Sequence, residues 1–302
     1  MKRAAGGGRT GIDGRRVALF LAIAFAIAWA VGLIVALSGG LTDSPMLVPS
    51  LRLTLATVLL ATGYMWAPAL AHIITRLATR EGWSDTWLRP YPRGWPSWLA
   101  AWFGPAVLTI LGMALFFLVL PRYYDPSLST LRRLLGPRAA STNLWGLVAT
   151  EVLGAVLVAP VLNGLFTLGE EFGWRAYLLP KLMPLGWRKA TVLVGVIWGV
   201  WHWPVIAMGY EYGFGYRGFP WVGFLTFLWF TVPGSVLLAW VTRRGKCVWP
   251  AVVGHGAING IAGLAALFVQ GQPSPLLGPL PVGLIGGAAW MAAGIWVWLR
   301  GG

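Results

Sequence analysis

The chain has 302 residues, of which 57% are hydrophobic and 11% are charged, and its net charge is +14. This composition excludes an ordinary soluble domain, because several apolar runs approach the 20 residues with which a helix crosses a bilayer. Strand alternation is absent and backbone groups in lipid must pair internally, so we predict an all-α polytopic membrane bundle and no β-barrel. The single cysteine, Cys247, excludes an internal disulfide and a cysteine-based zinc site.

Eight membrane spans are predicted in chain order. They are expected at 17–38, 53–75, 97–120, 146–180, 189–209, 219–242, 248–269 and 278–299. The first apolar stretch is longer than that of a cleaved signal peptide, so we interpret it as a retained helix. We expect a basic cytoplasmic tail at 1–16, then one membrane domain at 17–302 with a catalytic core at about 146–269.

The distribution of basic residues indicates the orientation. With the N-terminus in the cytoplasm, seventeen Lys and Arg residues fall on the inner side and six on the outer side. This bias favours both termini inside a multi-pass protein of the cell membrane. The positive charge is therefore assigned to cytoplasmic loops and anionic lipid, and nucleic acid is not an expected partner.

The loop between the third and fourth spans carries four arginines on the expected outer side. Its segment 121–142 contains N-capping residues from Asp125 onward, followed by leucines at helical spacing. We predict a short helix lying on the membrane surface there.

Two adjacent acids, Glu170 and Glu171, interrupt the fourth span. A charge at the centre of a membrane helix costs on the order of 3 kcal/mol, so such residues indicate a functional site. Glu171 and Arg175 are four residues apart and can pair on one face, while Glu170 points about 100° away and stays available as a base. The alternative is a purely structural ion cluster.

Histidines and an asparagine occur at helical spacing in two later spans. Trp198 and His202 share a face in the fifth span, and His255 and Asn259 share a face in the seventh. A lone histidine on an apolar helix is more often a packing residue, and the neighbouring glycines are typical of close helix packing. Depths of about 10–20 Å from the cytoplasmic side nevertheless place the polar groups in one layer. We therefore expect one site that opens toward the cytoplasmic half.

These motifs resemble those of the CPBP family, also called the Abi or CAAX protease family, which includes the type II CAAX prenyl endopeptidases. Glu170-Glu171 with Arg175, the aromatic Trp198 with His202, and His255 with Asn259 occur in the family's order and spacing. The specific motifs cover about 90 residues, and Trp198 replaces the usual phenylalanine.

The resemblance implies an intramembrane endopeptidase acting on a membrane-associated, hydrophobic or lipid-modified peptide. In this hypothesis Glu170 activates water that His202 helps to hold, His255 and Asn259 stabilise the oxyanion, and Glu171 orients Arg175. Glu170, His202 and His255 could instead bind a divalent metal such as zinc, although the His-Glu-x-x-His zinc motif is absent. The sequence does not choose between no cofactor and a metal.

Three other functions use the same features. A non-catalytic scaffold or bacteriocin-immunity protein would keep the pocket without hydrolysis. A transporter would use the intramembrane acids and histidines for ions, but no repeated half is visible. A haem protein would use His202 and His255 as axial ligands.

Overall fold

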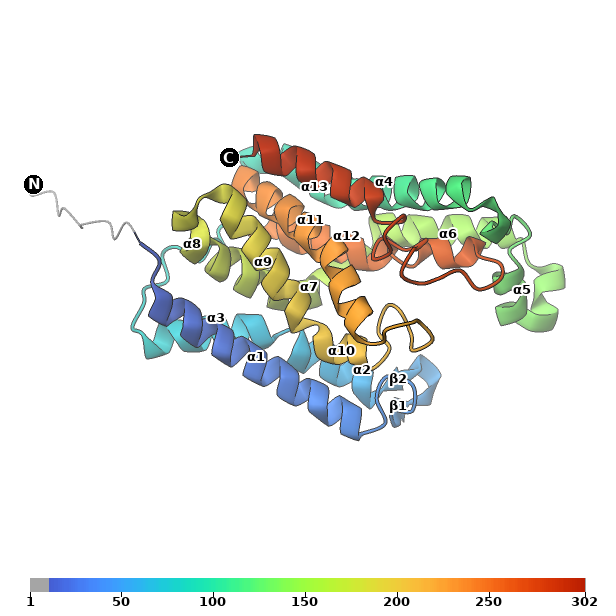
Figure 1. The fold of residues 1–302 in the computed structure, drawn as a ribbon, viewed down its shortest axis with the longest axis horizontal. Coiled ribbons are helices and arrows are strands. Elements are labelled where there is room, and N and C mark those ends of the chain that lie inside the picture. The colour runs from blue at the N-terminus through green and yellow to red at the C-terminus, as the bar shows by residue number, and fades with distance from the viewer. Residues whose placement is uncertain (1–10, 302) are drawn as a thin grey trace, which may run out of the picture.

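The computed structural model describes residues 11–301, and it is almost entirely helical (Figure 1). Residues 1–10 of the predicted basic tail lie outside the described residues. The helices are α1 (Gly14–Leu37), α2 (Leu55–Leu59), α3 (Ala67–Ala78), α4 (Trp95–Val119), α5 (Ser129–Leu135), α6 (Leu144–Leu157), α7 (Ala159–Gly173), α8 (Leu179–Leu182), α9 (Trp187–Trp201), α10 (Trp203–Ala207), α11 (Trp221–Gly245), α12 (Trp249–Ile261) and α13 (Ala288–Arg300). Two short antiparallel strands, β1 (Met46–Val48) and β2 (Leu53–Thr54), join α1 to α2.

Six helical segments of the described chain are long and apolar enough to cross a membrane. They are Gly14–Leu37, Leu55–Ala78, Pro92–Val119, Trp187–Ala207, Trp221–Gly245 and Trp249–Phe268. A seventh is possible if α6 and the helices that follow it, bent by 46°, form one broken span. This confirms the predicted polytopic helical bundle.

Two predicted spans differ in detail from the observed helices. The span expected at 146–180 breaks at Val158, because Pro160, the second residue of α7, cannot donate a backbone hydrogen bond to the preceding turn. The span expected at 278–299 is helical only from Ala288, where α13 begins, because 278–287 form a loop. The prediction followed the length of each apolar run, and the prolines and glycines within these runs are the sequence signal that it passed over.

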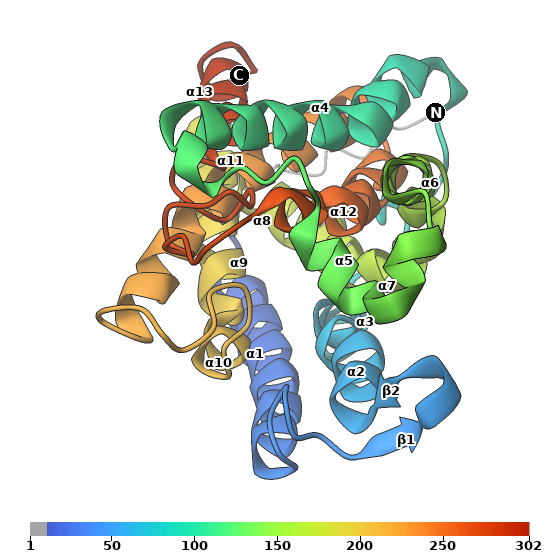
Figure 2. The ribbon, with the colours of Figure 1, turned by 90° about the vertical axis from the view of Figure 1, so that its right-hand side faces the viewer.

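The start of α1 and the end of α13 lie at the same end of the bundle (Figure 1). We call this the basic end, because it also carries Arg76, Lys181 and Arg243 near the ends of their helices. The opposite end, which faces the viewer in Figure 2, carries the β1–β2 hairpin and the loops 208–220 and 269–287. The sidedness of these ends in a cell membrane remains a prediction.

The segment 121–142 contains the short helix expected there, α5, at the opposite end of the bundle. Asp125 accepts hydrogen bonds from the backbone N–H groups of Ser127 and Ser129. Although burial opposes it, these hydrogen bonds and the Ser127 hydroxyl lower the pKa of Asp125 to about 2. Leu128 and Leu131 pack with Phe268, so the helix is joined to the bundle by an apolar contact.

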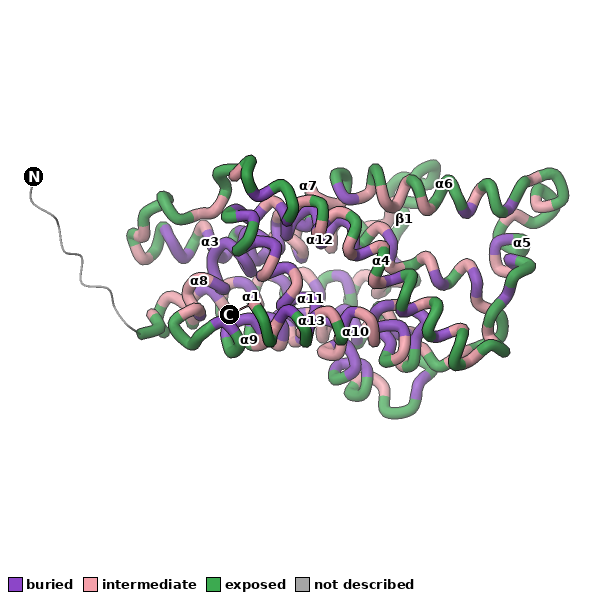
Figure 3. Tube along the Cα trace, turned by 90° about the horizontal axis from the view of Figure 1, so that it is seen from above, coloured by how far each residue is buried: buried purple, intermediate pink, exposed green. Residues whose placement is uncertain are grey.

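Buried residues concentrate where α7, α9, α11 and α12 meet, whereas α6 buries only Leu144 and Val148 (Figure 3). The close approach of these helices depends on glycine. A Cβ atom on Gly256 of α12 would lie 2.6 Å from the Pro160 carbonyl oxygen, and one on Gly169 would lie 2.6 Å from the Met65 carbonyl oxygen. Glycine at these two positions therefore allows α7 to lie against both α12 and α3.

Candidate active site

The two acids of α7 have different partners. Arg175 Nη1 donates to Glu171 Oε1 over 2.9 Å, and both side chains are fully buried. Glu170 is 2% exposed, and its Oε2 accepts a hydrogen bond from Trp198 Nε1 over 2.7 Å. The structure thus makes the expected i,i+4 pair and directs Glu170 toward α9.

α12 brings His255 to the same acids. Its Nδ1 lies 2.8 Å from Glu171 Oε1, so this carboxylate oxygen contacts both Arg175 and His255. Arg175 also lies 4.9 Å from the centre of the Trp198 ring, in a cation–π arrangement. Glu171 therefore connects α7 to α12, and Trp198 connects α7 to α9.

His202 lies where α9 ends and α10 begins. Pro204 follows within the first turn of α10 and cannot donate the hydrogen bond that would continue α9. His202 Nδ1 lies 2.8 Å from the Trp198 carbonyl oxygen. The Trp198 ring has edge contacts with both imidazoles, at centroid distances of 5.8 Å to His202 and 5.3 Å to His255.

These contacts define which ring nitrogens remain available. A carbonyl oxygen can only accept, so His202 carries a proton on Nδ1, and in its neutral form the ring presents a lone pair at Nε2. His255 likewise donates from Nδ1 to the Glu171 carboxylate. Consequently, His255 can donate from Nε2 to an oxyanion only as an imidazolium, whereas the Asn259 amide can donate in either state.

Four of the six predicted residues line two adjoining pockets, which we call together the central cavity. A lobe of about 160 Å³ is lined by Glu170, His202, His255 and Asn259, together with Tyr64 and Tyr210. A second lobe of about 340 Å³ shares His202, Tyr210, His255 and Asn259 with the first. Glu171 and Arg175 line neither lobe, so they support the site from behind.

The metal alternative requires Glu170, His202 and His255 to converge on one point. Within residues 11–301, no group of three His, Cys, Asp or Glu side chains has an arrangement that could hold a metal ion. Trp198 donates to Glu170 Oε2, and both histidines direct Nδ1 at protein oxygens. The metal-free mechanism is therefore the one taken up below as a proposal.

Sequence reasoning missed two cavity residues in the loop that follows α10. Tyr210 lines both lobes and Glu211 lines the larger one. The negative charge of Glu211 raises the pKa of Tyr210, and burial and the charge of Glu170 act in the same direction. Burial raises the pKa of Glu211 to about 7, and the Tyr210 phenol opposes this shift. The available signal was that Glu211 is one of only nine acids in the chain.

The larger lobe of the central cavity is bounded by loops at one end of the bundle. It is lined by Glu211 and by Leu280, Pro281 and Val282, which belong to loops at the end opposite the basic end. The expected opening toward the cytoplasmic half stays a prediction, as does the depth of the polar groups in the membrane.

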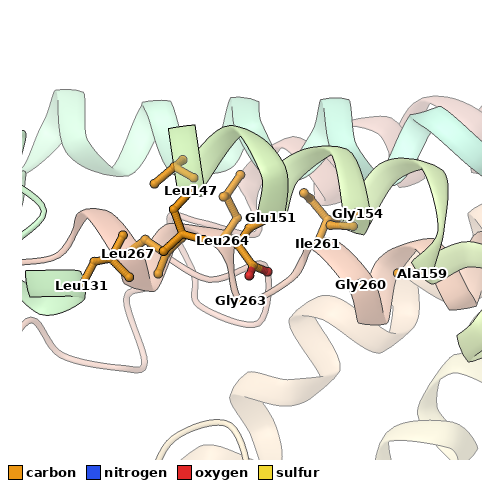
Figure 4. Close-up of a pocket in the computed structure, with 12 residues that line it drawn as sticks. Leu131, Leu147, Glu151, Gly154, Ala159, Gly260, Ile261, Gly263, Leu264 and Leu267 are labelled. Atoms are coloured by element: carbon orange, nitrogen blue, oxygen red, sulfur yellow. The ribbon is translucent and has the colours of Figure 1, made fainter. Parts of the chain in front are cut away.

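A second cavity of about 440 Å³ lies between α6 and the end of α12 (Figure 4). Its walls are apolar except for Glu151, and it shares Gly263 with the larger lobe of the central cavity. None of the predicted catalytic residues lines it. It is therefore a neighbour of the candidate site and not part of it.

Comparison with known proteins identifies the same region. Residues 145–261 match the family model described as "Type II CAAX prenyl endopeptidase Rce1-like". This match contains all six predicted site residues and confirms the family resemblance inferred from the three motifs.

Two curated proteins are similar to parts of the chain. The CAAX prenyl protease 2 of Methanococcus maripaludis is 30% identical over 93 residues, which cover 30% of this chain and 34% of that protein. The phosphatidylserine decarboxylase proenzyme of Rhodospirillum rubrum is 30% identical over 70 residues, covering 23% of this chain and 20% of that protein. The matched segments thus span about a third and a fifth of these relatives.

Proposed function

We propose that this protein is an intramembrane endopeptidase that hydrolyses peptide bonds in hydrophobic or lipid-modified peptides. The observation that carries the proposal is the common cavity of Glu170, His202, His255 and Asn259, which come from three separate helical segments. The similarity to CAAX prenyl endopeptidases supports the same reaction class and makes a prenylated peptide one candidate substrate.

Glu170 is the proposed general base. Trp198 Nε1 holds its Oε2, and no other described residue donates a hydrogen bond to its Oε1. A water molecule in the cavity can therefore donate one proton to Glu170 Oε1 and its other hydrogen to the lone pair on His202 Nε2. General base assistance of this kind contributes roughly 10²–10⁴ in rate.

The reaction then follows from this arrangement. As Glu170 takes the proton, the water oxygen bonds to the carbonyl carbon and the carbonyl π electrons move to its oxygen. The Asn259 amide donates to this oxyanion, a contribution worth about 10²–10³ in rate. The tetrahedral intermediate collapses as the C–N bond breaks, and the protonated Glu170 returns the proton to the leaving nitrogen.

Glu171 and Arg175 have a positioning role in this proposal. The Glu171 carboxylate fixes His255 through Nδ1, which aims the other side of the ring at the cavity. No step is assigned to a metal, because the donor atoms do not converge. Activity that survives exhaustive metal removal from purified protein would agree with this assignment, and loss restored by zinc would contradict it.

The decisive experiment compares membranes that contain the wild-type protein with membranes that contain Glu170→Gln. This variant keeps the acceptor for Trp198 Nε1 and removes the basic oxygen. New peptide termini should appear with the wild type and disappear with Glu170→Gln. Glu151→Gln serves as the matched control, because it removes an acid from the neighbouring cavity and should leave the termini unchanged.

A non-catalytic scaffold makes the opposite prediction. Partner binding and any protective phenotype would then persist in Glu170→Gln at wild-type levels. Equal termini in both membranes, with both proteins inserted at equal amounts, would overturn the endopeptidase proposal.

A further inference from the structure

Glu211 places a second acid in the central cavity, apart from the proposed base. Glu170 lines the smaller lobe, whereas Glu211 lines the larger lobe on the side of the loops. The lobes share Tyr210, whose phenol experiences the charges of both acids. The central cavity thus contains Glu170, the proposed general base, in its smaller lobe. In its larger lobe it contains Glu211, a carboxylic acid with no role in the proposed reaction.

Glu211 has no ion-pair partner in the part of the chain that the structure describes. The ion pairs among residues 11–301 engage Asp13, Glu81, Asp85 and Glu171, and none includes Glu211. Arg217 belongs to the same loop but is exposed, and no ion pair joins it to Glu211. A cavity carboxylate that interacts with the phenols of Tyr210 and Tyr212 but forms no ion pair among the described residues can still accept a charged partner from outside.

The backbone holds Glu211 in place. Its φ angle is 65°, which lies in the left-handed region that residues other than glycine seldom adopt. The next residue, Tyr212, is 3% exposed and donates a hydrogen bond from its hydroxyl to the Val282 carbonyl oxygen over 2.8 Å. Because Tyr212 fixes the loop against 276–287, the unusual backbone at Glu211 is maintained by its surroundings.

The rest of the larger lobe suits a long cationic side chain. Trp198, Phe227 and Phe230 provide aromatic walls. Such walls accept the methylene stem of lysine or arginine and attract the charge that it carries. Glu211 lies among them as the counter-ion.

We propose that Glu211 is a specificity-determining residue that binds a lysine or arginine side chain of the peptide beside the bond to be cut. This inference rests on the proposed endopeptidase function and adds a basic residue to the hydrophobic substrate. It also predicts that the basic side chain enters from the loop-lined end of the cavity.

The test uses hydrophobic peptides with acetylated and amidated ends and an uncharged fluorophore. One series carries a single lysine at each position in turn, and its twin carries norleucine there. At one position the wild type should cleave the lysine peptide with kcat/KM about tenfold or more above its twin. The nearly isosteric Glu211→Gln should reduce this ratio to about one, whereas Glu151→Gln should retain it.

A charge reversal sharpens the result. Glu211→Lys should favour a peptide with glutamate at the same position over the lysine peptide. A wild-type ratio near one at every position would overturn the inference, as would a ratio that Glu211→Gln does not change. Thermal unfolding of each purified variant identifies any that fail to fold, and Glu211→Gln and Glu211→Lys supply independent readings.

Binding separates this inference from the proposed reaction. Peptide affinity is measured by fluorescence anisotropy in the Glu170→Gln background, with and without Glu211→Gln. If no peptide is cleaved but the lysine peptide binds about tenfold more tightly only with Glu211 present, the cation site stands and the endopeptidase proposal fails. If peptides are cleaved and the lysine advantage is absent from both measurements, only the cation site fails.

Discussion

Two polar clusters, one buried and one partly exposed, lie along the segment from α7 to α8, and they differ in how completely their atoms are paired. The basic-end cluster comprises Arg16, His72, Arg76, Glu81, Asp85, Tyr177 and Lys181. In it Arg76 donates to His72 Nε2 and to the Gly82 carbonyl and pairs with Asp85 at 2.8 Å, while Glu81 bridges Arg76, Arg16 and Lys181. The central cluster comprises the buried contacts of Glu170, Glu171, Arg175, Trp198, His202 and His255. In it Arg175 Nε, Arg175 Nη2 and Glu171 Oε2 have no partners among the described residues.

The difference separates a structural from a functional arrangement of the same residue types. Each unpaired buried polar atom costs about 1–3 kcal/mol, so a protein retains several together only where another requirement outweighs stability. The basic-end cluster has a mainly structural pattern of contacts. In the central cluster, Glu170 and the imidazoles face a cavity. The expected effects of mutation follow from this contrast.

The largest difference is expected between Glu171→Gln and Glu81→Gln. Glu171→Gln leaves Arg175 without its ion pair and removes the anion beside His255, so the free energy of unfolding should fall by about 3 kcal/mol. Turnover per folded molecule should fall about 100-fold or more, because His255 loses its orientation. Glu81→Gln should lower stability while turnover per folded molecule stays near the wild-type value. Thermal unfolding in detergent and peptide cleavage measure the two quantities, and equal turnover in both variants would remove the distinction.

A matched pair of histidines gives the second contrast. His72 contacts the Phe172 carbonyl oxygen through Nδ1 and accepts from Arg76 through Nε2, so both ring nitrogens are occupied. We expect His72→Leu to destabilise the protein by about 1–3 kcal/mol and to preserve turnover. His255→Leu should abolish turnover in whatever fraction folds. Loss of turnover per folded molecule in His72→Leu would show that the basic-end cluster also serves the reaction.

The lysine preference should depend on pH. The pKa of Glu211 is about 7, so its carboxylate is charged above pH 7 and neutral below it, whereas a lysine side chain stays charged throughout. The preference should be complete near pH 8 and lost near pH 6. Tyr210, His202, His255 and Glu170 also line the cavity, so the measured quantity is the ratio of lysine to norleucine cleavage, in which effects on catalysis itself cancel. A ratio that is constant from pH 6 to pH 8 would contradict the role of Glu211.

The smallest effect is expected outside both clusters, at Asp125. Asp125→Ala removes the acceptor for the N–H groups of Ser127 and Ser129 and should cost about 1 kcal/mol. The folded-state pKa of about 2 lies below the ordinary value, so this stabilisation is present above about pH 4 and disappears as the pH falls through 2. Faster hydrogen exchange confined to α5, with unchanged turnover, is the expected signature.

The sequence indicated the bundle and the grouping of the site residues for identifiable physical reasons. Apolar runs of spanning length specify membrane helices, and the i,i+4 spacing places Glu171 with Arg175 and His255 with Asn259 on shared faces. The break at Val158 was not predicted, because the prediction followed the length of the apolar run and did not use Pro160 as a helix-breaking signal. One Glu171 oxygen accepts hydrogen bonds from both Arg175 and His255. This requires α12 to approach α7, and local spacing in the sequence does not encode that approach.

Glu211 escaped prediction for a related reason. It lies in a glycine-rich loop where no helical period indicates its direction, and only the backbone angle and the contact of Tyr212 with Val282 place it in the cavity. No role was predicted for His72. Its contact with Phe172 joins segments 100 residues apart, which local spacing does not reveal.

The π-helical turn at Trp174–Leu178 connects the two clusters. Such a turn contains one residue more than an α-helical turn, so it changes the angular phase of everything that follows. Glu171 precedes this turn, Tyr177 lies within it and Lys181 follows it, and the last two both reach Glu81. Deleting one residue here would restore regular winding and rotate the downstream side chains by about 100°. This one added residue thus sets the angle, around the axis of the continuous helical segment, between the side chains that serve the two clusters.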